Sequence, residues 1–134
     1  MNDRQYNAKV EDLNRRMRMI EAKRCDCRRH GQELEFIAEE LNNCNCQAKQ
    51  LLGEIEYRWS HDRQLQAHIV EGMHITDQIV RTNADFYQAG EDALNDQRRS
   101  FNLEEESIDR ERGELNSRAA EDYRANQDFG KDSF

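Results

Sequence analysis

The sequence predicts an all-α protein built as a long antiparallel helical hairpin of coiled-coil type. The 134 residues include no proline, and 36% of them are charged while only 36% are hydrophobic, which favours long helices with exposed faces over a compact globule. Hydrophobic residues recur at alternating spacings of three and four, the period of helices that pack along a neighbour. The first 30 residues are basic and the chain from Leu103 onward is acidic, which suits arms running in opposite directions.

The first arm is expected over residues 3–58, with a full heptad seam, meaning the line of residues that faces the other helix. Its apolar positions are Tyr6, Val10, Leu13, Met17, Ile20, Cys27, Leu34, Ala38, Leu41, Ala48, Leu52, Ile55 and Trp59. Three further seam positions hold Arg24, Gly31 and Asn45, and polar residues there fix register at a cost in stability. Gly31 should weaken the helix by about 1 kcal/mol relative to alanine without ending it.

The second arm is expected over residues 62–126 and has a thinner apolar stripe. One seam position recurs every seven residues as Met73, Val80, Tyr87, Leu94, Phe101, Ile108 and Leu115. We assign the complementary position to Ala84, Glu91, Arg98, Glu105, Arg112 and Ala119. Such a helix lies along a neighbour but is not buried on all sides.

The two heptad registers meet at residues 59–63, where we predict the turn. Ser60 and Asp62 are both good N-caps for the second helix. The arms then form one domain over residues 1–127, followed by a flexible tail over 128–134. In this hairpin the basic residues 1–30 lie beside the acidic residues 90–120. We favour this pairing over nucleic acid or anionic lipid as the role of the basic segment, although each exposed pair contributes at most about 1 kcal/mol.

A two-helix hairpin buries a single seam and leaves other apolar side chains partly outside. We expect these to be Phe36, Ile37, Leu51, Ile69, Ile79, Phe86 and Leu103. Apolar surface of this kind is what a partner covers. We predict partner contacts along the second arm at Trp59, Ile69, Met73, Val80, Phe86, Tyr87, Leu94, Phe101, Ile108 and Leu115.

No catalytic or cofactor motif is recognisable, so we expect neither an enzyme nor a bound cofactor. The cysteines form two C-x-C pairs, Cys25 with Cys27 and Cys44 with Cys46. Residues two apart on a helix point about 200° apart, and the pairs are roughly 25 Å apart along a continuous helix. We therefore expect reduced thiols, with intermolecular disulfides or a zinc-responsive coiled coil as alternatives. His30, His61, His68 and His74 show no metal-ligand spacing.

The N-terminus lacks the apolar core of a signal peptide, and no apolar run approaches the roughly 20 residues of a membrane span. We therefore expect a cytoplasmic protein without membrane insertion. Export together with a partner is left open, as is self-association. Nucleic acid is not an expected partner, because the chain carries a net charge of -8 and its arginine run lacks interleaved aromatic residues.

The segment from Leu51 to Leu115 resembles a known class of small helical proteins. It combines Trp59-Ser60-His61-Asp62 and an amphipathic helix with Leu94-x3-Arg98-x2-Phe101, Glu105, Glu106, Ile108, Asp109, Arg110, Glu111, Arg112 and Leu115. In this it resembles the accessory proteins encoded beside LXG toxins of bacterial type VII secretion systems. The resemblance implies a targeting chaperone that, with a second small helical protein, binds the helical N-terminal domain of the toxin for export.

Tyr87 and Glu91 also match the Tyr-x-x-x-Asp/Glu form of type VII export signals. Two alternatives to the chaperone hypothesis stay open. One is a coiled-coil stalk-type component of another secretion apparatus, similar to the type III export stalk. The other is a generic structural coiled coil.

Overall fold

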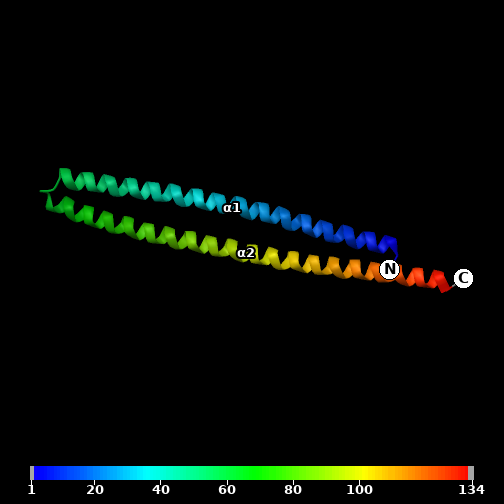
Figure 1. The fold of residues 1–134 in the computed structure, drawn as a ribbon. Coiled ribbons are helices and arrows are strands. Elements are labelled where there is room, and N and C mark those ends of the chain that lie inside the picture. The colour runs from blue at the N-terminus through cyan, green and yellow to red at the C-terminus, as the bar shows by residue number, and fades with distance from the viewer. Residues whose placement is uncertain (1, 133–134) are drawn as a thin grey trace. The chain divides into compact units, whose positions relative to one another are not determined.

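The computed structural model describes residues 2–132, with side chains described as far as residue 128. It contains two helices, α1 (Asp3–Arg58) and α2 (Arg63–Asp132), and no strand occurs in this part of the chain. The helices are joined by a short turn and pack against each other as a hairpin (Figure 1). The predicted fold class and the predicted position of the turn are confirmed.

Both helices begin with side-chain caps. At the start of α1 the backbone N–H of Gln5 donates to Oδ1 of Asn2 at 2.8 Å, and the backbone N–H of Asn2 donates to Oε1 of Gln5 at 3.3 Å. This reciprocal pair satisfies two backbone donors at the helix end. At the start of α2 the backbone N–H of Leu65 donates to Oδ1 of Asp62 at 3.0 Å. Of the two N-cap candidates in the sequence, Asp62 therefore caps the helix.

The end of α1 is satisfied from the other side of the turn. The side-chain amide of Gln66 donates to the backbone carbonyls of Glu56 at 3.3 Å and Trp59 at 3.0 Å. The final carbonyls of a helix have no partner within the helix, so these bonds replace water at its end. The backbone N–H of Asp62 also donates to the Trp59 carbonyl at 3.1 Å. Backbone and side-chain hydrogen bonds thus close a turn that contains neither glycine nor proline.

The contacts within the chain group into two compact units, and the single domain over residues 1–127 stays a prediction. The terminal unit combines Met1–Cys27 with Asp96–Phe134, and the turn unit spans Arg28–Asn95. The flexible tail expected over 128–134 falls largely outside the described side chains. The backbone of α2 continues to Asp132, and residues 133 and 134 lie outside the described residues.

The terminal unit has a closed apolar core between its two helical segments. Leu13 and Ile20 from α1 are buried against Ile108 and Leu115 from α2, and Ile108 is 0% exposed. The partly buried side chains packed on this cluster are Tyr6, Val10, Met17 and Phe101. Burying each aliphatic side chain contributes about 1.5–3 kcal/mol. All eight residues belong to the predicted seams.

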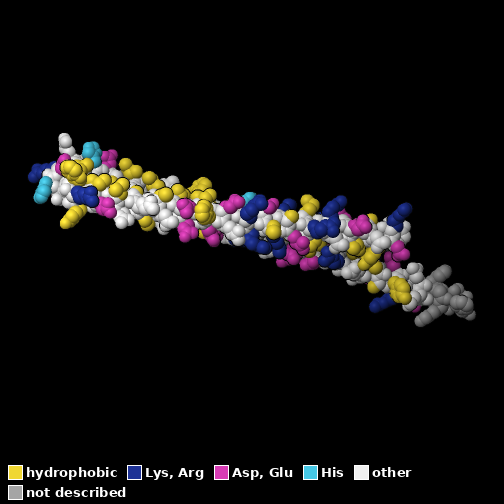
Figure 2. Space-filling view, turned by 90° about the horizontal axis from the view of Figure 1, so that it is seen from above, with side chains coloured by type: hydrophobic (Ala, Val, Ile, Leu, Met, Phe, Trp, Pro, Cys, Tyr) yellow, Lys and Arg dark blue, Asp and Glu magenta, His cyan; other side chains and the backbone are white. Residues whose placement is uncertain are grey.

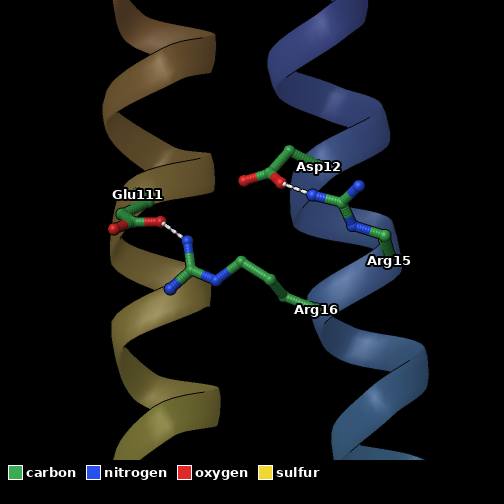
Figure 3. A network of polar contacts seen from close by, with 4 residues as sticks. All are labelled: Asp12, Arg15, Arg16 and Glu111. Atoms are coloured by element: carbon green, nitrogen blue, oxygen red, sulfur yellow. Dashed lines mark hydrogen bonds and ion pairs between the residues drawn. The ribbon is translucent and has the colours of Figure 1, made fainter.

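Charged side chains bridge the helices at the edges of the terminal core. Arg16 of α1 pairs with Glu111 of α2, as Figure 3 shows, while Arg15 turns to Asp12 on its own helix. Arg24 pairs with Glu105 and donates a further hydrogen bond at 2.8 Å to Oδ1 of Asn102. The predicted pairing of the basic start with the acidic second half is therefore observed.

The turn unit has a seam of smaller and more polar residues. Ile69, Thr76 and Leu94 are buried, at 3%, 7% and 7% exposure. A Cβ built on Gly90 would lie 2.8 Å from Cδ2 of Leu34, and one built on Gly72 would lie 3.3 Å from Cδ2 of Leu52. These two glycines make room for leucines from the facing helix.

The complementary seam position of α2 was predicted wrongly in the turn unit. Ala84 is exposed, whereas the preceding residue, Asn83, is half-buried. One heptad later, both Gly90 and Glu91 are half-buried. The buried series is Ile69, Thr76, Asn83 and Gly90, one position earlier than expected. The cause is that threonine, asparagine and glycine do not register as core residues in a hydrophobic pattern. In the terminal unit the predicted positions Glu105, Arg112 and Ala119 are half-buried, while Arg98 is exposed.

Replacing glycine by alanine should separate the packed glycine from an unpacked one. Gly113→Ala should stabilise the protein by up to about 1 kcal/mol, because alanine favours the helix and nothing lies within 4 Å of the added Cβ. Gly90→Ala should gain less or lose stability, because Leu34 must move. Urea unfolding followed by far-UV circular dichroism measures both. Equal stabilisation by the two variants would contradict the packing of Leu34 on Gly90.

Candidate partner-binding face

Large exposed hydrophobic side chains gather in the turn unit. Among residues 2–128, three lie in the terminal unit: Met19, Leu103 and Tyr123. The other ten lie in the turn unit: Phe36, Ile37, Leu41, Leu51, Tyr57, Trp59, Val70, Ile75, Ile79 and Phe86. In Figure 2, hydrophobic side chains are most frequent toward the left, where the turn lies. Exposed apolar surface of this extent is typical of an interaction site, whereas single scattered hydrophobic residues are ordinary on a protein surface.

Four of these side chains, Ile37, Leu51, Ile79 and Phe86, belong to a regular stripe on each helix. On α1, Ile37, Cys44 and Leu51 are seven residues apart, and each follows a seam residue by three positions. On α2 the same offset from the seam selects Gly72, Ile79, Phe86 and Ala93. Apolar residues at three of seven positions are typical of helices packed in a bundle, beyond the two positions that a two-helix coiled coil needs.

The two stripes lie on the same side of the turn unit. Lys49 and Asp77 form an ion pair at 2.6 Å, which places both side chains at one edge of the seam. On α1, Cys44 is five residues from Lys49 and therefore points about 140° away from it. On α2, Ile79 is two residues from Asp77 and points about 160° away from it. Both stripes consequently border the opposite edge of the seam.

We name this surface the open face. It consists of Ile37, Leu41, Cys44 and Leu51 from α1 with Ile75, Ile79 and Phe86 from α2. Phe86 is 70% exposed and Leu51 is 58% exposed. Thr82, Ala89 and Ala93 continue the surface along α2 without introducing a charge. The arrangement places an apolar strip along one side of the two helices of the turn unit.

The predicted partner-binding residues divide into two groups. Trp59 and Phe86 are exposed and accessible to a partner. The buried group is Ile69, Leu94, Ile108 and Leu115, and the half-buried group is Met73, Val80, Tyr87 and Phe101. These eight residues lie in the hairpin's own seam, and their contact with a partner stays a prediction. Ile69, expected outside, is 3% exposed because it lies in this seam.

Sequence reasoning identified part of the open face and missed part. Ile37, Leu51, Ile79 and Phe86 were expected to be exposed, and they are. Ile75 was not singled out, although it also lies at the border of the α2 stripe. The signal that finds Ile37, Cys44, Leu51, Ile79 and Phe86 is a second set of uncharged residues, each three positions after a seam residue.

The residues of the candidate export signal interact within the turn unit. Tyr87 and Glu91 lie four residues apart on α2, one helical turn from each other. Desolvation of the phenol raises the pKa of Tyr87, and the negative charges of Glu91 and Glu35 raise it further. Glu35 belongs to α1, so this pair is at the helix–helix edge that also carries Lys49 and Asp77.

A polar group weakens the seam beside the open face. The side-chain amide nitrogen of Asn83 is buried without a hydrogen-bond partner, and no other buried side-chain nitrogen or oxygen among the described residues is left so. Leaving a buried polar group unsatisfied costs about 1–3 kcal/mol. The turn unit therefore combines a seam of lower stability with an uncovered apolar surface.

The cysteines and the charged hollows do not add a second candidate site. The four cysteines, all within the described residues, form no disulfide, and of the four only Cys27 is buried. No cluster of three or more His, Cys, Asp or Glu side chains with metal-binding geometry occurs in the described part of the chain. A hollow of about 1030 Å³ in the terminal unit is lined by charged residues of both signs, among them Arg16 and Glu111. These two side chains are already paired with each other.

Comparison with known proteins does not assign a family. No protein-family model, curated protein or solved structure matches the chain. Within the described residues, neither helix contains a stretch long and apolar enough to cross a membrane. The functional interpretation therefore depends on the open face itself.

Thiol reactivity should follow the burial of the cysteines. In the native chain Cys25, Cys44 and Cys46 should react rapidly with a thiol-specific reagent, because their side chains are exposed, and Cys27 should react only as the helices separate. Peptide mapping after a short pulse of alkylation identifies the labelled residues. Rapid labelling of Cys27 would show that the seam is not closed at that position.

Acid stability should depend on Asp77. The hydrogen bond and charge of Lys49 hold the pKa of Asp77 below its ordinary value of 3.8. A lowered folded-state pKa stabilises the fold above the unfolded-state pKa, and this contribution is lost as the pH falls from about 5 to about 2. Asp77→Asn should therefore lose less stability than the native chain over this range in thermal melts.

A matched variant for this experiment is Asp92→Asn. The Asp92 carboxylate accepts a hydrogen bond at 3.0 Å from the Gln88 side chain instead of pairing with Lys49. It should retain most of the native dependence on pH. If Asp77→Asn and Asp92→Asn follow the same pH profile, the Lys49–Asp77 pair does not contribute to stability in solution.

Proposed function

We propose that this protein is a non-enzymatic helical adaptor whose turn unit binds helices of a partner protein. The main support for this proposal is that the two units differ in how much hydrophobic surface they expose. The terminal unit closes its core with Ile108 and flanks it with ion pairs such as Arg16–Glu111. The turn unit leaves ten large hydrophobic side chains exposed. A partner helix that covers this exposed surface would complete the helical bundle and stabilise it.

The specific form of the proposal is a targeting chaperone for an LXG-type toxin of a type VII secretion system. The resemblance of residues 51–115 to accessory proteins of that system motivates it. The partner is then the helical N-terminal domain of the toxin, together with a second small helical protein. The adaptor acts in the cytoplasm, and co-export with its partner is compatible with the same role. Trp59, which is 57% exposed beside the turn, is available as an aromatic anchor.

A second candidate function is a stalk-type component of another secretion apparatus. Its motivation is the set of ion pairs that bridge α1 and α2 in the terminal unit, Arg16–Glu111 and Arg24–Glu105. An antiparallel coiled coil of this type transmits position or force between partners without chemistry of its own. Binding to a rotary export ATPase, in preference to a toxin domain, would select this function.

Co-expression with the helical domain of a neighbouring LXG toxin tests the chaperone proposal. We expect a stable complex in size-exclusion chromatography with light scattering, because the toxin domain covers apolar surface exposed in the free chain. An unrelated helical bundle of similar length serves as the control partner. If the chain stays monomeric beside the toxin domain at micromolar concentration, the chaperone proposal is wrong.

A further inference from the structure

We infer that the open face accepts an amphipathic helix whose apolar stripe is flanked by lysine and arginine residues. This inference rests on the proposed adaptor function and specifies the chemistry of the partner. It follows from the charges along the two borders of the face. Apolar heptad stripes resemble one another, so the bordering charges decide which helix fits.

The border of the open face on α1 is acidic. Glu33 and Glu40 precede Ile37 and Cys44 by four residues, and Glu54 follows Leu51 by three. Residues three and four apart share a helix face, so each carboxylate stands beside an apolar residue of the stripe. All three glutamates are exposed.

The border on α2 is acidic as well. Asp85 and Asp92 directly precede Phe86 and Ala93, and both carboxylates are on exposed residues. They lie outside the uncharged positions Ile75, Thr82 and Ala89. Asp85 and Asp92 point about 100° away from Phe86 and Ala93, so they lie toward the back of α2 and border the face less directly than the glutamates of α1 do.

Acidic residues outnumber basic residues around these borders, and Arg29, Arg58 and Arg81 stand one helical turn from Glu33, Glu54 and Asp85. The turn unit contains twelve acidic and six basic residues between Arg28 and Asn95. Lys49 is paired with Asp77 at the opposite edge of the seam, and Arg81 also acts on Asp77. The remaining four basic residues stand at the two ends of the unit: Arg28, Arg29, Arg58 and Arg63.

The size of the face suits a helical partner. The α2 stripe from Gly72 to Ala93 is about 32 Å long at 1.5 Å per residue, and two helices side by side are about 20 Å wide. This footprint of roughly 600 Å², before side-chain relief is counted, approaches the roughly 800 Å² that each partner buries in a stable interface. The face is therefore at the lower end of the size range of specific interfaces.

A second copy of this chain fits the face less well than a basic-flanked helix. Two copies meeting through their open faces would bring the borders containing Glu33, Glu40 and Asp85 against equivalent carboxylates. Like charges brought together at an interface cost several kcal/mol. A helix with lysine or arginine at its flanking positions instead gains from the same carboxylates and associates faster at low salt.

The first experiment compares two synthetic helices with identical leucine heptads, one with lysine and one with glutamate at the flanking positions. The full-length chain should bind the lysine-flanked helix at least about tenfold more tightly at low salt. The difference should shrink at about 0.5 M salt, where screening is strong. Fluorescence anisotropy of the labelled helix measures both affinities. Equal binding of the two helices would overturn the inference.

Two matched variants locate the binding surface. Phe86→Glu changes the open face and Leu103→Glu changes the terminal unit, and the native side chains are 70% and 67% exposed. Both variants add one negative charge to α2, so general attraction of a basic helix changes equally. We expect Phe86→Glu to weaken binding of the lysine-flanked helix at least about tenfold, as loss of a buried aromatic anchor does, and Leu103→Glu to leave it unchanged. Equal effects would overturn the inference.

Thiol protection in the native chain gives an independent readout that does not depend on the folding of a variant. Cys44 lies in the open face, whereas Cys46 is exposed and two residues away, on another side of α1. Saturation with the lysine-flanked helix should slow alkylation of Cys44 and leave Cys46 reactive. Unchanged reactivity of Cys44 would overturn the inference. So would a chain that is dimeric by itself and becomes monomeric with Phe86→Glu, since a second copy would then occupy the face.

The same variants separate this inference from the proposed function. A toxin complex that survives Phe86→Glu would support the adaptor function and overturn the assignment of the open face. Binding of the lysine-flanked helix without any complex with the toxin domain would support the open face and overturn the toxin chaperone. If the native chain binds neither the lysine-flanked helix nor the toxin domain, both proposals are overturned.

Discussion

A pair of packed helices buries only one line of contacts on each helix, and this constraint governs the rest of the molecule. Every residue beyond the seam must be soluble by itself or be covered by something else. The terminal unit and the turn unit meet this requirement differently. In the first, charged residues such as Arg16 and Glu111 border the buried core and pair across it. In the second, Ile37, Ile79 and Phe86 border the seam and remain exposed.

The two units also differ in how well the seam itself is filled. Ile20 and Ile108 in the terminal unit are almost completely buried, at 1% and 0% exposure. In the turn unit Gly90 faces Leu34, and the buried amide of Asn83 lacks a partner. Much of the helix–helix stability is thus expected to come from the terminal unit. A partner bound at the open face would add buried area where the hairpin has least, coupling binding to local stability.

Heptad spacing was sufficient to predict the hairpin, and cap chemistry was sufficient to place its turn. Along α1 the seam positions are buried or half-buried from Tyr6 to Ile55 apart from Leu41, which is 39% exposed. Along α2 hydrophobicity alone misplaced the complementary seam, because Asn83 and Gly90 face α1 without being hydrophobic. The candidate site was harder to predict for a related reason. A stripe such as Val80 to Leu115 looks like a partner surface until the hairpin's own contacts are known, and only then do the residues left over define a face.

The placement of charge explains why the open face need not be an unselective hydrophobic surface. Its apolar residues supply area, and area of this kind favours any helix with a heptad stripe. The charged borders are more selective than the apolar area. Glu33, Glu40 and Asp85 disfavour helices with acidic flanks, including a second copy of the chain. The terminal unit uses opposite charges to choose its internal partner, as in Arg24 with Glu105. The turn unit has twelve acidic and six basic residues, and we infer that its excess of carboxylates selects a partner helix with basic flanks.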